Sequence, residues 1–569
     1  MKNSTVFIIL FVVGFLVFGN SLFNGFVWDD LIQIRENRSI YALQDIPTFF
    51  ARNDLNLLFY RPIFFTYFAV VINLLGDQPI AFHIVQLFIH CINSSLVFLL
   101  FLHYFRRNTS LFLSMIFLVH PLVTESVIYI SAAGEPLYTF FGLVAFLLLR
   151  KKQAWGRILP AILLLFLSLL SKETAVAFFC LITINMVIQK RLTFLYGAIL
   201  SVPIFLYIFL RLVVAKIYYD PLSYFPLMQT DILERLLSLP KILSYYITLF
   251  IFPNNLAIDQ QWIVRTITLY DFYLPLAISL ATLFVIIKLA LTQISKRGQS
   301  RPTVLYFLSW VLLGMLPYLQ LFPLEMTVAP RYMYFSLIGV LGMCGIWIDR
   351  LHFPRQSWQK TALTATAILV ICILAGRTIL RNQDWKDPYT LYSRDIIQSP
   401  DSYTLQSNLG KILFEQGEYQ QAEVHLKKSV ELSPTWWGNW NNLGNVYLRT
   451  DRLQKAKESY SKAISNNDLF FEAYNNLAYA LLLEGKNYEA KAILIRAINR
   501  TGEQPKLFLL LAIAEYRLGN RQAALGYVQY ADQSLQTPLS EDIYQRIILN
   551  QRIELNLYNH VTQYGNLTM

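Results

Sequence analysis

The sequence contains few charged residues for its length. Only 15% of its 569 residues are Asp, Glu, Lys or Arg and 55% are hydrophobic, whereas a soluble globular domain carries about 25% charged residues. This composition excludes an ordinary soluble enzyme and indicates an integral membrane protein. The net charge of +12 does not indicate a nucleic-acid partner, because the basic residues stand in short loops between apolar runs.

Cysteine is also scarce. The four cysteines, Cys91, Cys180, Cys344 and Cys372, all lie within apolar runs. The sequence has no Cys-x-x-Cys pair and no Cys/His spacing typical of a zinc site. It therefore excludes a disulfide-stapled scaffold and a structural metal of that kind.

Long apolar runs occupy the first two thirds of the chain. We interpret residues 6–22 as an uncleaved first span rather than a signal peptide, because no small-x-small cleavage motif follows. Several of the later runs are shorter than the 17–25 residues expected of a span. These runs fall near 83–104, 110–121, 136–149, 158–170, 174–188, 193–214, 272–290, 303–320, 332–348 and 361–380.

Five loops between the runs are basic, and they predict the orientation. Loops rich in Lys and Arg lie in the cytoplasm, so the N-terminus is expected there too. Runs 62–75 and 236–252 then cannot cross, and we expect them on the outer face, which is periplasm or ER lumen. About eleven spans result, with the C-terminal part outside. The basic residues are Arg106, Arg107, Arg150, Lys151, Lys152, Arg157, Lys190, Arg191, Lys296, Arg297, Arg301, Arg350, Arg355 and Lys360.

A repeat follows the last apolar run. Residues 403–538 are polar, and pairs such as Leu409-Gly410 and Leu443-Gly444 recur every 34 residues. This period, with small residues at fixed positions, predicts four tetratricopeptide repeats and hence an α-solenoid. Residues 540–557 are predicted to form a helix that caps the open end.

The predicted fold class is therefore all-α, with a polytopic membrane part before the solenoid. The predicted boundaries are 1–384 for the membrane domain, 385–402 for a connector, 403–538 for the repeats and 539–569 for the capping helix and tail. A repeat array can bind an extended peptide. Four asparagines on first helices of the repeats are candidates for peptide contact or for packing within the solenoid, namely Asn441, Asn442, Asn475 and Asn476.

The segment Phe26–Asp30, "FVWDD", directly follows the first span. Its two carboxylates, Asp29 and Asp30, would cost roughly 2.5–3.5 kcal/mol each if they were buried in the membrane. Such a pair is a candidate functional site, and the alternative is a solvated flank of the span.

The predicted topology brings further ionisable residues to the same face. Basic side chains at headgroup depth suit the phosphate of a lipid-linked donor, although a lysine there can also simply extend toward the membrane surface. The basic candidates are Lys172, Arg331 and Arg61. His120, Glu125 and Glu135 lie at the same face, and each can instead serve a helix end.

These motifs resemble, in order and spacing, those of the transmembrane and tetratricopeptide repeat-containing proteins, a branch of the GT-C glycosyltransferases. The matching segments are "FVWDD", "YRPIFF", "FHIVQLFIHCINSSLV", "HPLVTESV", "LLSKETAV", "APRYMYFSL" and "RNQDWKDPYTLY". The resemblance implies transfer of mannose from a dolichyl- or polyprenyl-phosphate donor to Ser or Thr hydroxyls of a protein.

The resemblance implies an inverting transfer, and the residues suit it. Lys172, Arg331 and Arg61 would bind the donor phosphate. Asp30 would act as the general base with Asp29 orienting it, or the reverse. His120, Glu125 and Glu135 would shape the acceptor side or hold a divalent ion. The competing classes are a non-enzymatic membrane scaffold that presents the repeats and a transporter, which would need more ionisable residues at mid-span.

Overall fold

A computed structural model describes residues 2–51, 59–150, 155–218, 227, 230–294, 300–321, 324–349, 357–535 and 538–555. The described residues up to Gln398 form one compact unit, and those from Ser399 onward form a second. Over these ranges the chain is helical and contains no β-strand longer than the isolated bridge between Gln260 and Val328. The predicted all-α fold class is confirmed.

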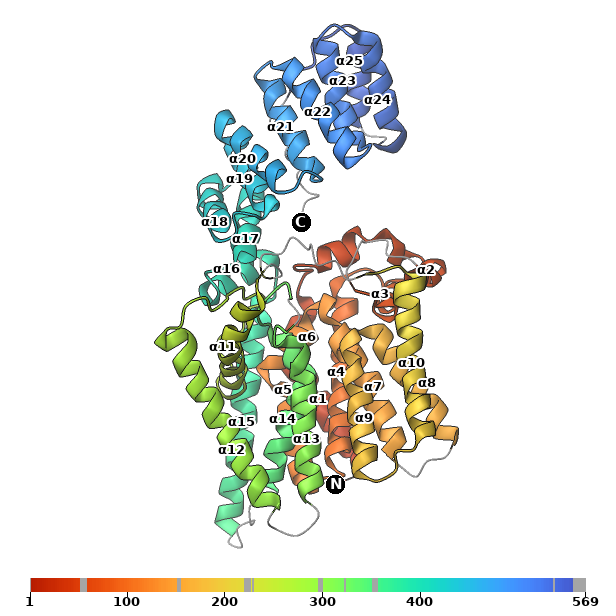
Figure 1. Ribbon diagram of the computed structural model, residues 1–569, viewed down its shortest axis with the longest axis vertical. Helices are drawn as coiled ribbons and strands as arrows, with labels where there is room; N and C mark the ends of the chain where they lie inside the picture. Colours follow the sequence, from red (N-terminus) through yellow and green to blue (C-terminus); the bar gives the residue numbers. More distant parts are fainter. Residues whose placement is uncertain are drawn as a thin grey trace. The chain divides into compact units, whose positions relative to one another are not determined.

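The first unit is a bundle of long helices with short helical turns between them (Figure 1). Its helices are α1 (Asn3–Phe18), α2 (Ile46–Ala51), α3 (Pro62–Leu75), α4 (Pro79–Phe101), α5 (Arg107–Val119), α6 (Thr124–Ile128), α7 (Gly134–Arg150), α8 (Trp155–Ser171), α9 (Val176–Ile188), α10 (Phe194–Phe209), α11 (Ile232–Ile251), α12 (Leu274–Ile294), α13 (Ser300–Met315), α14 (Met333–Ile348), α15 (Ser357–Asp384) and α16 (Pro388–Gln398).

Among the described residues, seven helical segments are long and apolar enough to cross a membrane. They are Asn3–Phe23, Pro79–Phe101, Ile130–Arg150, Phe194–Val214, Leu269–Lys288, Pro330–Ile348 and Trp358–Asp384. The pair Arg107–Val119 and Pro121–Ile128, bent by 49°, makes eight if it is one span. The predicted multi-pass membrane protein is confirmed, while the count of eleven stays a prediction. Neither α3 nor α11, which contain runs 62–75 and 236–252, is among these segments of the described chain.

Among the described residues, the basic turns of the bundle lie at the end that carries the N-terminus, opposite α2 and α3 (Figure 1). The Asp349 carboxylate at the end of α14 accepts hydrogen bonds from the Arg106 backbone N–H at 3.0 Å and the Thr109 hydroxyl at 2.8 Å. The Arg150 guanidinium lies 4.5 Å from the centroid of the Tyr104 ring. The turns around Arg106, Arg150 and Asp349 therefore meet at one end.

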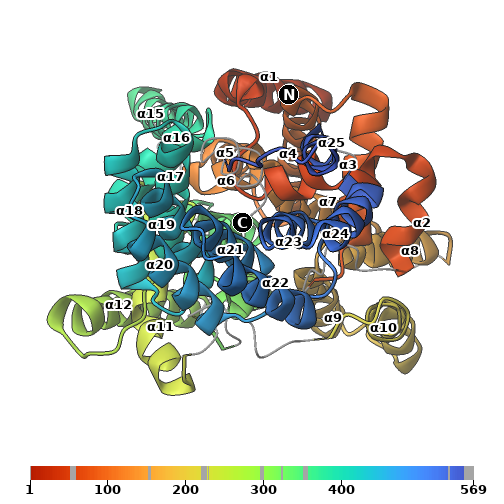
Figure 2. The same cartoon turned by 90° about the horizontal axis from the view of Figure 1, so that it is seen from above.

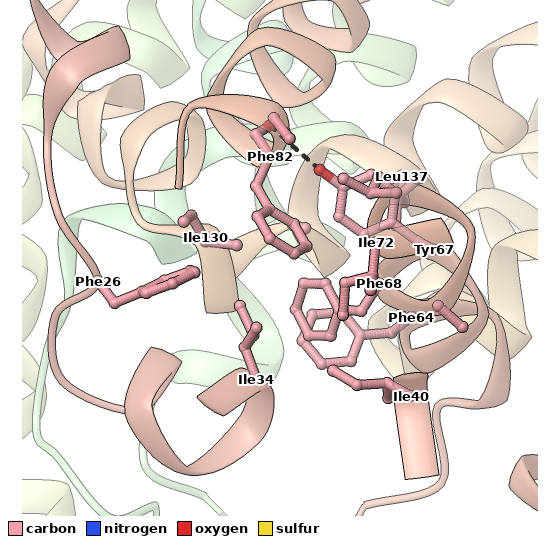
Figure 3. Packing of buried hydrophobic residues seen from close by; sticks show 14 of the residues in the cluster. Phe26, Ile34, Ile40, Phe64, Tyr67, Phe68, Ile72, Phe82, Ile130 and Leu137 are labelled. Carbon is pink, nitrogen blue, oxygen red and sulfur yellow. Dashed lines mark hydrogen bonds between the residues drawn. The ribbon is translucent and has the colours of Figure 1, made fainter. Parts of the chain in front are cut away.

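Helix α3 packs through an aromatic face at the other end. Pro62 begins the helix, since a proline at the first position sacrifices no helical hydrogen bond, and Gly76 ends it with φ +95°. Phe64 and Phe68 are buried against Ile40 and Phe82 (Figure 3). The Phe26 ring belongs to the same cluster, so the packing of α3 also holds the segment that leads to the acid pair.

The second unit consists of helix pairs that follow one another from α17 to α24 (Figure 2). A Cβ atom on Gly410 would come within 2.7 Å of Leu426, and one on Gly444 within 2.5 Å of the Tyr460 ring, so the recurring glycine allows the close packing within a pair. The helices are α17 (Tyr403–Glu415), α18 (Tyr419–Leu432), α19 (Trp437–Arg449), α20 (Leu453–Asn466), α21 (Phe471–Leu483), α22 (Asn487–Thr501), α23 (Pro505–Arg517), α24 (Arg521–Leu535) and α25 (Pro538–Ile548).

The last helix is shorter than predicted. The sequence predicted a helix over 540–557, of which 556 and 557 lie outside the described residues. Helix α25 ends at Ile548, and Asn550 follows with φ 53°. The Gln551 N–H donates back to the Arg546 carbonyl at 2.8 Å, which satisfies a carbonyl of the last turn.

Candidate functional site

The acid pair lies in a tight turn after the first span. Trp28, with φ 53°, is in the left-handed region, which is unfavourable for a bulky residue. Its ring packs against that of Tyr392 in α16, with centroids 5.7 Å apart. The Gly25 N–H donates to the Lys386 carbonyl at 2.9 Å. Contacts with the segment after the last span therefore fix the direction of the turn.

Asp30 is buried and its two oxygens are occupied. Oδ1 accepts from the Ser131 backbone N–H at 2.8 Å and the Ser131 hydroxyl at 2.6 Å, and Oδ2 accepts from the Val27 N–H at 3.1 Å. Burial raises the pKa of Asp30 to about 7 against the opposing effect of these hydrogen bonds. Asp30 therefore joins the first loop to the segment before α7.

Asp29 points differently and remains partly exposed. Its backbone N–H donates to the Tyr129 hydroxyl at 3.3 Å. Burial raises the pKa of the Asp29 carboxyl, while the Tyr129 hydroxyl and the positive charge of Arg331 oppose that shift. Glu325 is exposed to solvent and is a charged neighbour of Asp29. The more accessible carboxyl of the pair is thus Asp29.

Each of the three predicted phosphate-binding residues forms an ion pair with a carboxylate. Arg331, in the single turn directly before α14, pairs with Glu125 of α6, and its backbone N–H also donates to Glu125 Oε2 at 3.3 Å. Lys172 pairs with Glu135 in the first turn of α7. The structure therefore joins Glu125 and Glu135 to these bases directly.

The third pair is the most exposed of the three. The Arg61 guanidinium donates to both oxygens of Glu173, at 2.9 Å from Nε and 2.5 Å from Nη2. The exposed fractions of these side chains are 19% and 36%. Glu173 stands next to Lys172 in the sequence, so the two pairs are neighbours.

The two ring nitrogens of His120 contact backbone groups in this structure. Its Nδ1 accepts from the Leu122 N–H at 3.2 Å, and its Nε2 lies 3.1 Å from the Phe250 carbonyl oxygen. Within the described ranges, no group of three or more His, Cys, Asp or Glu side chains is arranged to hold a metal ion. The divalent ion of the sequence analysis therefore remains an untested prediction.

Sequence reasoning did not single out Tyr129 and Ser131, which hold the acid pair. Both lie in the uncharged stretch between Glu125 and Glu135, and neither carries a motif of its own. The only available signal was their position near the predicted outer end of a span.

Three of the four asparagines of the repeats, Asn441, Asn442 and Asn476, form side-chain contacts between successive first helices. The Asn476 amide donates to Asn441 Oδ1 at 2.9 Å and to Asn445 Oδ1 at 3.2 Å. Asn442 Nδ2 lies 3.5 Å from the Ser407 hydroxyl. Asn441 and Asn475 are buried, whereas Asn442 and Asn476 are partly exposed, so Asn442 and Asn476 are the two that a peptide could reach.

Comparison with family models supports the repeats. Two tetratricopeptide repeat models match the second unit, one at residues 404–433 and the other at 438–468 and 471–503. A crystal structure of MamA aligns with 28% of this chain and 89% of its own at 22% identity and a TM-score of 0.24, which is too low to carry an argument.

Curated relatives match both units. Human protein O-mannosyl-transferase TMTC3 is 25% identical over 487 residues, which cover 76% of this chain and 52% of the relative. Protein O-mannosyl-transferase F38B6.6 of Caenorhabditis elegans is 25% identical over 461 residues, covering 77% and 63%. The chain thus spans between about half and two thirds of the length of these relatives. The resemblance seen in the sequence is confirmed: the curated homologues of this chain are protein O-mannosyl-transferases of the TMTC family.

Proposed function

We propose that the chain is an integral-membrane mannosyltransferase. It takes mannose from a dolichyl- or polyprenyl-phosphate donor and transfers it to a Ser or Thr hydroxyl of a protein held by the repeats. The names of the relatives support the reaction class. The observation that carries the proposal is the accessible Asp29 carboxyl, with Arg331 as its electrostatic neighbour. Arg61 is a charged neighbour of Lys172, and Asp29, Arg331 and Arg61 are all charged neighbours of Glu325.

Asp29 acts as the general base. Of the two assignments that the sequence left open, the geometry favours this one, because both Asp30 oxygens accept hydrogen bonds from the chain itself. The acceptor hydroxyl oxygen attacks the anomeric carbon as its proton passes to Asp29. The bond from that carbon to the phosphate oxygen breaks, and its electron pair leaves with the lipid phosphate. Attack opposite the leaving group inverts the anomeric centre.

The leaving phosphate needs positive charge rather than a proton. Arg61, Lys172 and Arg331 supply it, and charge-assisted hydrogen bonds to phosphate contribute about 1.5–3 kcal/mol each. The Arg61–Glu173 pair is the most exposed, so its guanidinium is the first to exchange a carboxylate for the donor phosphate.

The orientation follows the basic turns. The end of the bundle that gathers Arg106, Arg107 and Arg150 faces the cytoplasm, and Asp29 faces the periplasm or ER lumen. The last span then delivers the repeats to the same side as Asp29. There the partly exposed Asn442 and Asn476 are available to hydrogen-bond the backbone of an extended acceptor.

The test is transfer by the purified full chain in lipid nanodiscs. Dolichyl-phosphate mannose with a radiolabelled sugar and a Ser/Thr-rich peptide are the probes. Wild-type protein is expected to label the peptide and Asp29→Asn to lose transfer. Asp77→Asn is the matched control, since Asp77 lies in the α3–α4 turn and its carboxylate accepts a hydrogen bond from the neighbouring Gln78 amide at 3.1 Å. A wild-type protein that neither labels the peptide nor releases mannose would favour the scaffold.

A further inference from the structure

A cluster of polar groups surrounds Lys172, and apart from Lys172 its members have no part in the proton transfer or in binding phosphate. It is formed where α7, the single turns η7 (Glu173–Ala175) and η11 (Leu316–Tyr318), and η12 (Pro330–Tyr332) come together. We call it the tyrosine cluster. Its members are Glu135, Tyr138, Thr139, Lys172, Thr174, Tyr318 and Tyr332.

Four oxygens of this cluster are buried and make no hydrogen bond of good geometry among the described residues. They are Glu135 Oε2, Thr139 Oγ1, Thr174 Oγ1 and the Tyr318 hydroxyl. Buried polar atoms are nearly always paired, and an unpaired group needs a specific explanation. The four belong to one place, because the Tyr138 hydroxyl has polar interactions with the side chains of Glu135, Thr139 and Thr174. Tyr318 likewise faces Thr174 and Glu135.

Two stacked rings lie beside these oxygens. Tyr318 and Tyr332 are parallel within 6°, with centroids 4.0 Å apart. Lys172 Nζ lies 5.8 Å and 6.0 Å from the two ring centroids. Tyr332 is partly exposed, and Arg331 and Glu325 are among its charged neighbours. The ring of Tyr332 therefore connects the tyrosine cluster with the surroundings of Asp29.

We propose that the tyrosine cluster binds the hexose ring of the donor and reads its hydroxyl groups. This inference rests on the proposed function and deepens it. Glu135 Oε2 accepts from a sugar hydroxyl, and the hydroxyls of Thr174 and Tyr318 donate or accept. The apolar C–H face of the sugar packs against Tyr332.

Charge also favours a neutral ring at this place. The Lys172 ammonium is balanced by Glu135, so the cluster has no net charge to attract a phosphate. The ammonium nevertheless has three N–H donors, of which one goes to Glu135. The other two can reach the phosphate to which the sugar is attached, so Lys172 marks the junction between the sugar and phosphate positions.

The test removes one hydroxyl at a time, and each of these oxygens makes no hydrogen bond of good geometry among the described residues. Tyr318→Phe and Thr174→Val are compared with Tyr306→Phe. The Tyr306 hydroxyl is also buried without a partner within the described residues. Its ring stacks on Tyr104, 5.6 Å away, near Arg150 at the basic end of the bundle. All three variants are expected to keep the wild-type melting temperature in nanodiscs.

The measurement is the affinity of the full chain for two probes, dolichyl-phosphate mannose and dolichyl phosphate. Wild type is expected to bind the mannosyl lipid more tightly. Tyr318→Phe and Thr174→Val should each weaken binding of the mannosyl lipid about three- to tenfold and leave dolichyl phosphate unchanged. Tyr306→Phe should change neither affinity.

The contrary outcomes are separable. If wild type binds both lipids equally, or if Tyr318→Phe weakens both by the same factor, the hexose assignment is overturned while the phosphate site and the proposed function stand. If wild type binds neither lipid, the proposed function fails, and the hexose site fails with it.

Discussion

Single substitutions of Asp29 and Asp30 distinguish a role in catalysis from a role in stabilising the fold. Asp29→Asn removes the charge of an accessible carboxyl that interacts with the Tyr129 hydroxyl, to which the Asp29 backbone N–H also donates. Asp30→Ala removes a buried side chain that accepts from Val27 N–H, Ser131 N–H and the Ser131 hydroxyl. We expect both variants to lose transfer, but for different reasons.

The magnitudes follow from these contacts. Loss of a general base typically costs 10²–10⁴-fold in rate, so Asp29→Asn should retain less than about 1% of transfer. Its effect on stability should stay within about 0.5 kcal/mol. Asp30→Ala leaves two backbone N–H groups unpaired in a buried turn. At about 1–3 kcal/mol each, the free energy of unfolding should fall by roughly 2–6 kcal/mol.

The assay combines two readouts on the same nanodisc preparations. Initial rates of mannose transfer report the chemistry, and the apparent melting temperature reports the fold. Asp29→Asn should keep the wild-type melting temperature and the affinity for dolichyl phosphate, whereas Asp30→Ala should melt several degrees lower. Wild-type turnover by Asp29→Asn, or an unshifted melting temperature together with full loss of transfer in Asp30→Ala, would refute the assignment of roles.

Three further predictions concern charge and orientation. Burial raises the pKa of Asp29 above its usual 3.8, and only the ionised carboxylate can accept a proton. On acidification kcat/KM should therefore fall at a higher pH than it would with an exposed aspartate. A fall in kcat/KM that sets in only at pH 4 or below contradicts this. Lys172→Met should destabilise the protein by about 3–5 kcal/mol because it leaves Glu135 buried and unpaired; adding Glu135→Gln should restore thermal stability but not donor affinity. In right-side-out vesicles of a variant without native cysteines, a membrane-impermeant maleimide should label Val424→Cys directly and Arg191→Cys only after detergent, and the reverse pattern would invert the topology.

The repeats were predictable from the sequence because their geometry is local. Each close approach involves residues within one helix pair, such as Gly410 against Leu426. The turns at Gly417 and Gly485 take positive φ, which glycine adopts without strain. The end of α25 could not be predicted, because the apolar alternation of 540–557 continues past the turn at Asn550.

The sequence predicted which charged residues belong to the candidate site, but it did not predict which of them form ion pairs with one another. The sequence gathered Arg61, Lys172 and Arg331 at one face, yet it did not predict that Arg61 pairs with Glu173, 112 residues away. Several carboxylates stood within the same predicted face, and only the packing of the bundle selects among them. The roles within the acid pair were also beyond the sequence, since adjacent aspartates differ only once the turn at Trp28 sets their directions.

The turn that carries the acid pair near the start of the chain is held by residues near the C-terminal end of the first unit. Asn24 donates to the Asn382 carbonyl, 358 residues later in the chain, and Trp28 rests on Tyr392. A ribosome adds about 5–20 residues per second, so the nascent turn waits roughly 20–70 s for these partners at that rate. The Asp29 and Asp30 side chains are therefore oriented only after the last span has been synthesised, and a chain released early lacks the contacts that shape this turn.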